Sequence, residues 1–246
     1  VNISADANLS DNVYTTASGS DAGGTGLTPA SPKATLGGLF AALHPGAGDV
    51  VLVDTGEYVG QTVLTDSGAV IVGSPNGAEL SWHGGGPALE ISNADDIVIQ
   101  GLHFDGEGLS IVDGAGSSDR ITVLESVFDA TGEAYAVSVT DGTDLLLAHN
   151  NLTGGTVTIH LSGTAGAVLH DNTLAGGGTG ILIDPASMTT GLLAENNRVS
   201  GMTTGIRWND AGGDGQILDN EVIDSTTGLH IAAAMGGGVV RGNDVS

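Results

Sequence analysis

Short runs of alternating apolar and polar residues follow one another along the chain, and their apolar positions line up from run to run. One column of apolar residues stands three positions before a recurrent Asn-x-Leu or Asn-x-Val motif, and its members are Ile99, Val123, Leu147, Leu169, Ala194, Ile217 and Val240. Two further columns stand two residues apart in the next run: Ile159, Ile181, Ile206 and Leu229, then Leu161, Ile183, Trp208 and Ile231. Apolar residues at i and i+2 point to one side of a strand, and no helical period accompanies them. The pattern predicts short strands with one apolar side.

These strands belong to a repeat. Its marker residues are Asn150, Asn172, Asn197, Asn220 and Asn243, at spacings of 22, 25, 23 and 23 residues, and the register extends back to Ser126, Leu102 and Ser74. A unit of this size cannot bury its apolar side alone, but units stacked about 4.8 Å apart merge into one core. Connections between parallel strands are almost always right-handed. We therefore predict an all-β chain that forms a right-handed parallel β-helix, with 22–25 residues per coil.

The repeated asparagines have a structural interpretation. Asn tolerates the left-handed conformation that a sharp corner between strands requires, and stacked Asn side chains can hydrogen-bond to their equivalents in neighbouring coils. We predict such a ladder at the five marker asparagines, and we expect glycines to provide turn geometry at the next corner: Gly180, Gly205 and Gly228. The Gly-Gly-Gly-Thr-Gly segment at 176–180 matches no phosphate-binding motif, and no helical pattern follows it.

Composition narrows the possible partners. The 246 residues include 42 glycines and no cysteine, so neither a disulfide nor a thiolate metal site can form. Twenty-nine acidic residues against five basic ones give a net charge of −24, which disfavours nucleic acid and anionic membrane surfaces as partners. No apolar run is long enough for membrane insertion. Calcium-loop motifs do not occur, so we expect no cofactor, with loosely bound Ca²⁺ as the alternative.

The N-terminal segment 13–60 carries a family resemblance. The matching residues form a Gly-Ser-Asp loop, a Ser-Pro-x-x-Thr helix start, a Pro-Gly and a Gly-x-Tyr: Tyr14, Gly19, Ser20, Asp21, Ser31, Pro32, Thr35, Pro45, Gly46, Asp49, Gly56 and Tyr58. This opening resembles right-handed β-helix proteins of the pectate-lyase-like superfamily, as found in large bacterial extracellular and surface proteins.

A short helix is expected within this segment. Ser31 would cap it, with Pro32 at its first position. Its apolar face would comprise Leu36, Leu39, Phe40 and Leu43. Such a helix would cover the N-terminal end of the stack, as terminal repeats must. We predict a single domain over residues 1–246, with the N-terminal strand, loop and cap helix in 1–45 and the coils in 46–246.

The outward position between the second and third apolar columns carries the best candidate site. In successive coils it presents Glu90, Ser110, Ser138, His160, Leu182, Arg207 and His230, with Asp184, Asn209 and Asp210 at the turns beyond. Neighbouring positions would be about 4.8 Å apart along the stack. The candidate catalytic residues are His160, Arg207 and His230, and the candidate substrate-binding residues are Glu90, Asp184, Asn209 and Asp210. An ordinary solvated face is the alternative, because Leu182 interrupts the column.

Two other outward features need an interpretation. His149 and His170 stand beside the Asn corner in adjacent coils, as surface side chains or as zinc ligands. A second outward column is mostly apolar: Val98, Thr122, Leu146, Val168, Leu193, Gln216 and Val239. An exposed apolar column marks an interface or a covering segment, such as residues 1–12, a long loop or another molecule. Alternatively, the strand phase is off by one residue, which would exchange the two sides.

Two classes of function stay open. The resemblance implies polysaccharide lyases and hydrolases among the relatives, but the Asn-Thr-Asp, Gly-His-Gly and Arg-x-Lys motifs of the polygalacturonase-like branch are absent, and Lys33 is the one lysine. We favour a structural or adhesive module of an extracellular or cell-surface protein, with weak binding to polysaccharide or to neighbouring modules. A polysaccharide lyase or glycoside hydrolase acting along the outer face is the alternative. Because the last coil stops at its Asn corner, we also expect the chain to continue past Ser246 or this end to dock on a partner.

Overall fold

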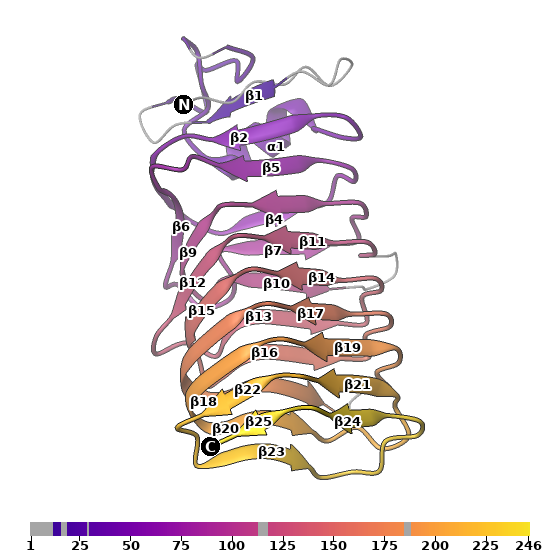
Figure 1. Ribbon diagram of the computed structural model, residues 1–246. Helices are drawn as coiled ribbons and strands as arrows, with labels where there is room; N and C mark the ends of the chain where they lie inside the picture. Colours follow the sequence, from indigo (N-terminus) through magenta and orange to yellow (C-terminus); the bar gives the residue numbers. More distant parts are fainter. Residues whose placement is uncertain (1–11, 16–18, 29, 113–117, 185–187) are drawn as a thin grey trace.

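The computed structural model describes residues 12–15, 19–28, 30–112, 118–184 and 188–246 (Figure 1). They form a right-handed parallel β-helix, in which every strand pairs in parallel with the equivalent strand of the next coil. This architecture confirms the predicted fold and the resemblance to β-helix proteins. In Figure 1 the coils descend from the N-terminal end at the top to the C-terminal end at the bottom.

The first face of the solenoid is a ten-stranded sheet. Its strands, in spatial order, are β1 (Asn12–Thr15), β2 (Val50–Val53), β5 (Val70–Gly73), β8 (Val98–Gln100), β11 (Thr122–Leu124), β14 (Leu146–Ala148), β17 (Val168–His170), β19 (Leu192–Glu195), β21 (Gly215–Leu218) and β24 (Val239–Arg241).

A fifteen-stranded sheet supplies the other two faces. The second face comprises β3 (Gly56–Val59), β6 (Ala78–Trp82), β9 (His103–Gly106), β12 (Val127–Ala130), β15 (Asn151–Gly154), β22 (Glu221–Ile223) and β25 (Asp244–Val245). The third face comprises β4 (Thr62–Leu64), β7 (Leu89–Ser92), β10 (Leu109–Val112), β13 (Tyr135–Thr140), β16 (Val157–Ser162) and β23 (Thr227–Ile231). Two long strands, β18 (Thr173–Asp184) and β20 (Arg198–Trp208), bend across both faces and join them.

The core is built from the predicted columns. Ile99 pairs with Val123, Val123 with Leu147, and the column continues in register to Val240. The columns that begin at Ile159 and Leu161 are likewise in register down to β23. Central members of these columns are completely buried, and the Phe104 and Phe128 rings stack with centroids 4.5 Å apart. The alternation of side chains along each strand therefore places one continuous apolar core inside the coils.

The asparagines form hydrogen bonds from coil to coil. Each side-chain Oδ1 accepts from the backbone N–H and the Nδ2 of the asparagine one coil earlier, as between Asn172 and Asn150 at 3.0 Å for both contacts. The same pair of contacts joins Asn197 to Asn172, Asn220 to Asn197 and Asn243 to Asn220. Asn150 in turn accepts from the Ser126 N–H.

The left-handed corner residue was misplaced by the sequence interpretation. The residue with positive φ is instead the one before each ladder asparagine: His149, Asp171, Asn196, Asp219 and Gly242, with φ between 51° and 72°. The ladder asparagine itself turns inward, where its amide meets the neighbouring amides. The expected role of the glycines at 180, 205 and 228 is also wrong, because none of them has positive φ. A Cβ at Gly180 would lie 2.6 Å from Gly205 O, so these glycines allow coils to approach closely.

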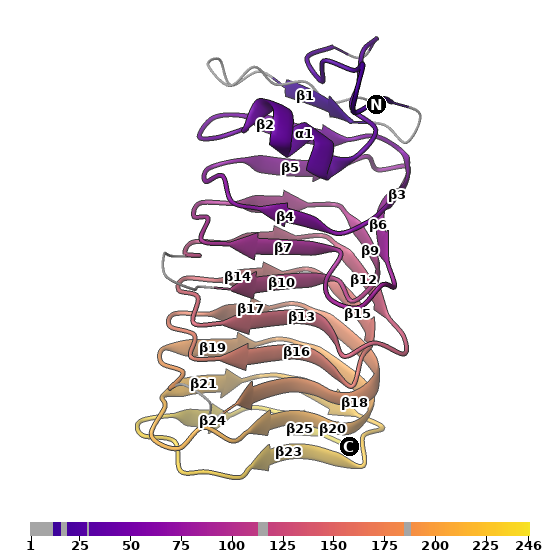
Figure 2. The ribbon, with the colours of Figure 1, turned by 180° about the vertical axis from the view of Figure 1, so that it is seen from behind.

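The described chain contains one helix, α1 (Leu36–Leu43), at the N-terminal end of the stack (Figure 2). Leu36, Leu39 and Phe40 are buried in the core, as the apolar face predicted. The predicted cap is wrong: the helix begins after Thr35, whose Oγ1 accepts from Gly38 N at 2.9 Å.

The Asp21 carboxylate explains the later start. It accepts hydrogen bonds from Ala34 N at 2.9 Å, Thr35 N at 3.0 Å and Thr35 Oγ1 at 2.8 Å. Ser31 Oγ accepts from Thr25 N instead of capping a helix. The preceding residues are therefore held by the loop and not by a helical turn. Lys33 lies in this loop, outside the helix, with Nζ donating to Asp21 O.

Candidate functional site

The predicted outward column lies on the third face, with its residues in register from Glu90 to His230. His160 Nε2 lies 3.4 Å from Asp184 Oδ2, and its ring stacks on Tyr135. Arg207 is the register partner of His230, and its Nε donates to Asn209 Oδ1 at 2.9 Å. Leu182 stands between His160 and Arg207, so the candidates form two separate groups. One is His160 with Asp184, and the other is Arg207 with Asn209 and His230.

The remaining candidates do not extend these groups. Asp210 is buried, accepts a hydrogen bond from Thr189 N, and its carbonyl accepts from Trp208 Nε1 at 2.6 Å. Its carboxylate therefore holds a corner of the coil. Glu90 is half-buried in β7, three coils from His160.

His149 and His170 do meet at the Asn corner. Their ring centroids are 6.0 Å apart, edge to face. His170 Nε2 lies 3.1 Å from Asp171 Oδ2, and its Nδ1 lies 3.2 Å from Glu195 Oε1. His149 Nδ1 is 3.8 Å from the same Asp171 carboxylate. Each ring is thus directed at carboxylates of neighbouring corners.

A richer cluster, not predicted from the sequence, lies on the second face. We call it the histidine–carboxylate surface, and its residues are Glu79, His83, His103, Asp105, Asp129 and Glu133. His103 Nδ1 lies 2.9 Å from Glu79 Oε2. His83 lies between two carboxylates, with Nε2 3.1 Å from Asp105 Oδ2 and Nδ1 3.1 Å from Glu133 Oε1. Asp105 and Asp129 are register partners in adjacent coils.

A sequence signal for this surface did exist. Glu79 and His103 are one period apart, as are Asp105 and Asp129, in strands that follow the Asn corner. His83 gives no periodic signal, because it reaches the cluster from the loop after β6 and contacts Glu133, 50 residues later.

Three pKa values on or beside this surface are shifted, in different directions. Hydrogen bonds to Glu133, and then to Asp105, raise the pKa of His83 above 6.5. Hydrogen bonds from the Thr131 side chain and N–H lower the pKa of Asp129. Burial, with a smaller contribution from the Glu133 charge, raises the pKa of nearby Glu107. Carboxyl groups of unequal acidity therefore lie close together on one face.

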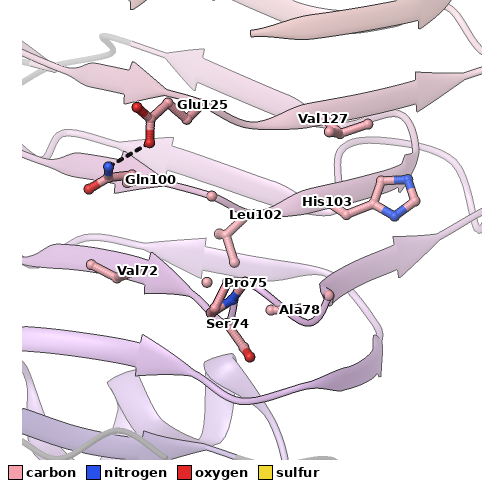
Figure 3. Close-up of a pocket in the computed structure, with 12 residues that line it drawn as sticks. Val72, Ser74, Pro75, Ala78, Gln100, Leu102, His103, Glu125 and Val127 are labelled. Atoms are coloured by element: carbon pink, nitrogen blue, oxygen red, sulfur yellow. Dashed lines mark hydrogen bonds between the residues drawn. The ribbon is translucent and has the colours of Figure 1, made fainter. Parts of the chain in front are cut away.

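A groove of about 610 Å³ adjoins this surface at the corner between the first and second faces. Figure 3 shows Val72, Ser74, Gln100 and Glu125 along it, with His103 projecting from β9 at its rim. Gln100 Nε2 donates to Glu125 Oε2 at 2.8 Å, so the polar wall is preformed. His103 belongs to both features, which makes the groove and the histidine–carboxylate surface continuous.

The fold and this surface define a parallel β-helix protein with a polar, strongly acidic outer face. The profile of the family described as "Periplasmic copper-binding protein (NosD)" matches residues 61–246, and the chain belongs to this family. None of the curated proteins matches the sequence.

Solved structures with similar architecture include two carbohydrate-active enzymes. The GH136 lacto-N-biosidase from Eubacterium ramulus is 11% identical, with a TM-score of 0.48 over 94% of this chain and 67% of the other. Endopolygalacturonase I from Stereum purpureum is 10% identical, with a TM-score of 0.32 over 80% of this chain and 94% of the other. ORF18 of Geobacillus virus E2 is 12% identical, with a TM-score of 0.30 over 83% of this chain and 53% of the other. No residue assignment follows from scores this low.

The family description names copper, which His, Cys, Asp or Glu side chains would have to bind. Among the described ranges, no group of three or more His, Cys, Asp or Glu side chains is arranged to hold a metal ion. His149 and His170 each direct a ring nitrogen at the Asp171 carboxylate, and the other nitrogen of His170 lies beside Glu195. These residues do not fit a copper site. None of the described helices is long and apolar enough to cross a membrane.

Proposed function

We propose that this chain is a carbohydrate-binding β-helix module that acts outside the cytoplasm, in the periplasm or at the cell surface. The ligand would lie across the second face, with one part in the corner groove and the next part over the histidine–carboxylate surface. One observation carries the proposal: His103 joins a 610 Å³ groove to a row of outward carboxylates and imidazoles.

The chemistry of these groups suits a sugar. Carboxylates accept hydrogen bonds from hydroxyl groups, and imidazole both donates and accepts. Val72, Pro75 and Val127 give the groove apolar patches against which a sugar ring can pack. The net charge of −24 repels uronates, so the favoured ligand is a neutral or amino-bearing glycan. The stiff stack of coils gives the module a structural or adhesive role as well.

Calorimetric titration with three soluble oligosaccharides tests the proposal: a neutral chitin fragment, its deacetylated form and an oligogalacturonate. Asp105→Asn and Glu133→Gln remove acceptor charge next to His83 and should weaken binding by about fivefold or more. Asp184→Asn is the matched control, because Asp184 is a carboxylate beside a histidine on the third face. Preferential binding of the oligogalacturonate, or an equal loss in the control variant, would contradict the proposal.

Glycoside hydrolysis is a second candidate, favoured by the pairing of Asp105 with Asp129 in adjacent coils and by Glu107, which follows β9 two residues after Asp105. Such enzymes use one ionised carboxylate and one protonated carboxyl group, set apart by their surroundings. Asp129, with its lowered pKa, suits the first role, and Glu107, with its raised pKa, suits the second. The test is the release of reducing ends from the same glycans, which Asp129→Asn should abolish and Asp184→Asn should leave unchanged. The lyase alternative has less support, since no lysine or arginine is among the six surface residues.

A further inference from the structure

The outer side of the first face carries an apolar stripe that the proposed glycan site does not use. The stripe runs down the stack in register and consists of Val50, Val70, Val98, Thr122, Leu146, Val168 and Leu193. Leu52 and Leu124, two residues further along their strands, widen it. The side chains of the stripe are half-buried against one another, not inside the core.

The residues on either side of a stripe residue show which way its side chain faces. Ile97 and Ile99, on either side of Val98, are completely buried, so Val98 faces outward as predicted. Of the described helices and strands, none packs on this outer side, and α1 lies at the end of the stack (Figures 1 and 2). A contiguous apolar patch framed by polar residues is typical of a protein interaction site.

Acidic side chains border the stripe on both sides. Asp96 and Asp144 precede β8 and β14, and both are exposed. Glu125, Asp171 and Asp219 follow β11, β17 and β21 at the left-handed corners, and all three are exposed.

Basic groups offset these borders only in part. Arg120 pairs with Asp96, its Nε lying 2.6 Å from Asp96 Oδ1. His149 lies 3.8 Å from Asp171, and His170 lies 3.1 Å from it. Both borders therefore remain net negative, consistent with the charge of the whole chain.

We propose that this face binds an amphipathic α-helix of a partner protein, with an apolar seam on the stripe and lysine or arginine residues over both acidic borders. Three strand residues span about 10 Å between the borders, which matches the 10–12 Å diameter of a helix. Coils repeat every 4.8 Å or so along the stack, close to the 5.4 Å pitch of a helix, so successive helical turns meet successive coils. Charge complementarity selects a basic partner over a second copy of this acidic chain.

The test uses two fluorescent peptides of leucine and lysine, each of about 18 residues so that a helix can form. One has its leucines at helical spacing, and the other has the same composition with the leucines scattered. Fluorescence anisotropy should show the amphipathic peptide binding about tenfold more tightly than the scattered one, since charge alone cannot distinguish them.

Variants of the chain test whether the peptide binds to the stripe. The double variant Leu146→Thr, Val168→Thr should weaken binding of the amphipathic peptide by about tenfold, because it replaces apolar side chains with polar threonines, which are β-branched and suit a strand. Val63→Thr is the matched control, since Val63 is an exposed strand residue on the third face, and it should bind within about twofold of the parent chain. Circular dichroism checks that all variants are folded.

Three results would overturn the proposal. Equal affinity for both peptides would mean that charge alone attracts them. Unchanged binding in the folded double variant would place the peptide on another face. Sedimentation that shows a dimer of the parent chain and a monomer of the double variant would mean that a second copy occupies the stripe. If the peptide binds the stripe, the methyl NMR signals of Leu146, Val168 and Leu193 shift on titration while that of Val63 does not.

Discussion

Replacing Asn197 by alanine is the most direct test of how the coils are held together. The Asn197 side chain is 1% exposed and takes part in five hydrogen bonds. Its Oδ1 accepts from the N–H and the Nδ2 of Asn172, at 3.1 and 3.0 Å. Its Nδ2 donates to Leu169 O, Glu195 O and Asn220 Oδ1, at 2.8, 3.1 and 3.0 Å.

Truncation to alanine removes this side-chain amide and leaves its partners in a space that water reaches poorly. A buried polar group without a partner costs roughly 1–3 kcal/mol, and the lost bonds overlap, so we expect a net loss of about 3 kcal/mol in unfolding free energy. For a domain of this size the melting temperature should fall by roughly 6–12 °C. Thermal unfolding followed by circular dichroism or calorimetry measures both quantities.

Two comparisons make the result specific to the ladder. Asn151→Ala changes an exposed asparagine next to ladder residue Asn150 and should alter stability by less than about 0.5 kcal/mol. The double variant Asn172→Ala, Asn197→Ala should lose less than the sum of the single variants, because the two residues share contacts. Equal melting temperatures for Asn197→Ala and Asn151→Ala, or strict additivity in the double variant, would refute the reasoning.

Three further expectations concern charge, packing and protonation. With a net charge of −24, the melting temperature should rise between about 10 mM and 1 M NaCl as the Debye length falls from about 30 to 3 Å, and a flat profile would mean that self-repulsion is weak. Phe128→Ala removes one of two stacked core rings and should cost about 3–5 kcal/mol by denaturant unfolding, whereas a loss under ~1.5 kcal/mol would indicate a core that collapses around the gap. The raised pKa of His83 means that its ion pairs stabilise the fold below pH 6.5 and stop doing so as the pH rises through the folded-state pKa. NMR titration should show that pKa falling in Glu133→Gln, and an unchanged value would exclude the contact.

The repetitive part of the fold could be predicted because its signals are local and recur. Strand alternation identifies the side that each residue faces, and the 22–25-residue period aligns the coils, so columns such as Ile159–Ile181–Ile206 follow directly. The left-handed corner residue was off by one, since Asn is favoured both in that conformation and in the ladder beside it. The two roles differ only in whether the side chain points inward, and the residue type alone does not show this direction.

The rest depends on contacts between distant residues. The helix start at Thr35 is set by Asp21, 14 residues earlier in an irregular loop, and a local capping rule therefore selected Ser31. The histidine–carboxylate surface was missed for a similar reason. Its central residue, His83, lies in a non-repeating loop after β6 and contacts Glu133 across the intervening coil. Periodicity predicts neighbours within the stack, whereas irregular corners bring side chains together by routes that no spacing encodes.

The coil-to-coil register has a consequence for how such a chain can change over evolutionary time. Thr173 and Arg198 are register partners, and each follows a ladder asparagine. Excising residues 173–197 would join Asn172 directly to Arg198, so the backbone would continue from the same corner with its inward and outward positions unexchanged. A duplication of that segment would likewise leave every later residue facing the same side of its strand. Unequal recombination can therefore lengthen or shorten this solenoid by whole coils, making its length a heritable variable that changes independently of its cross-section.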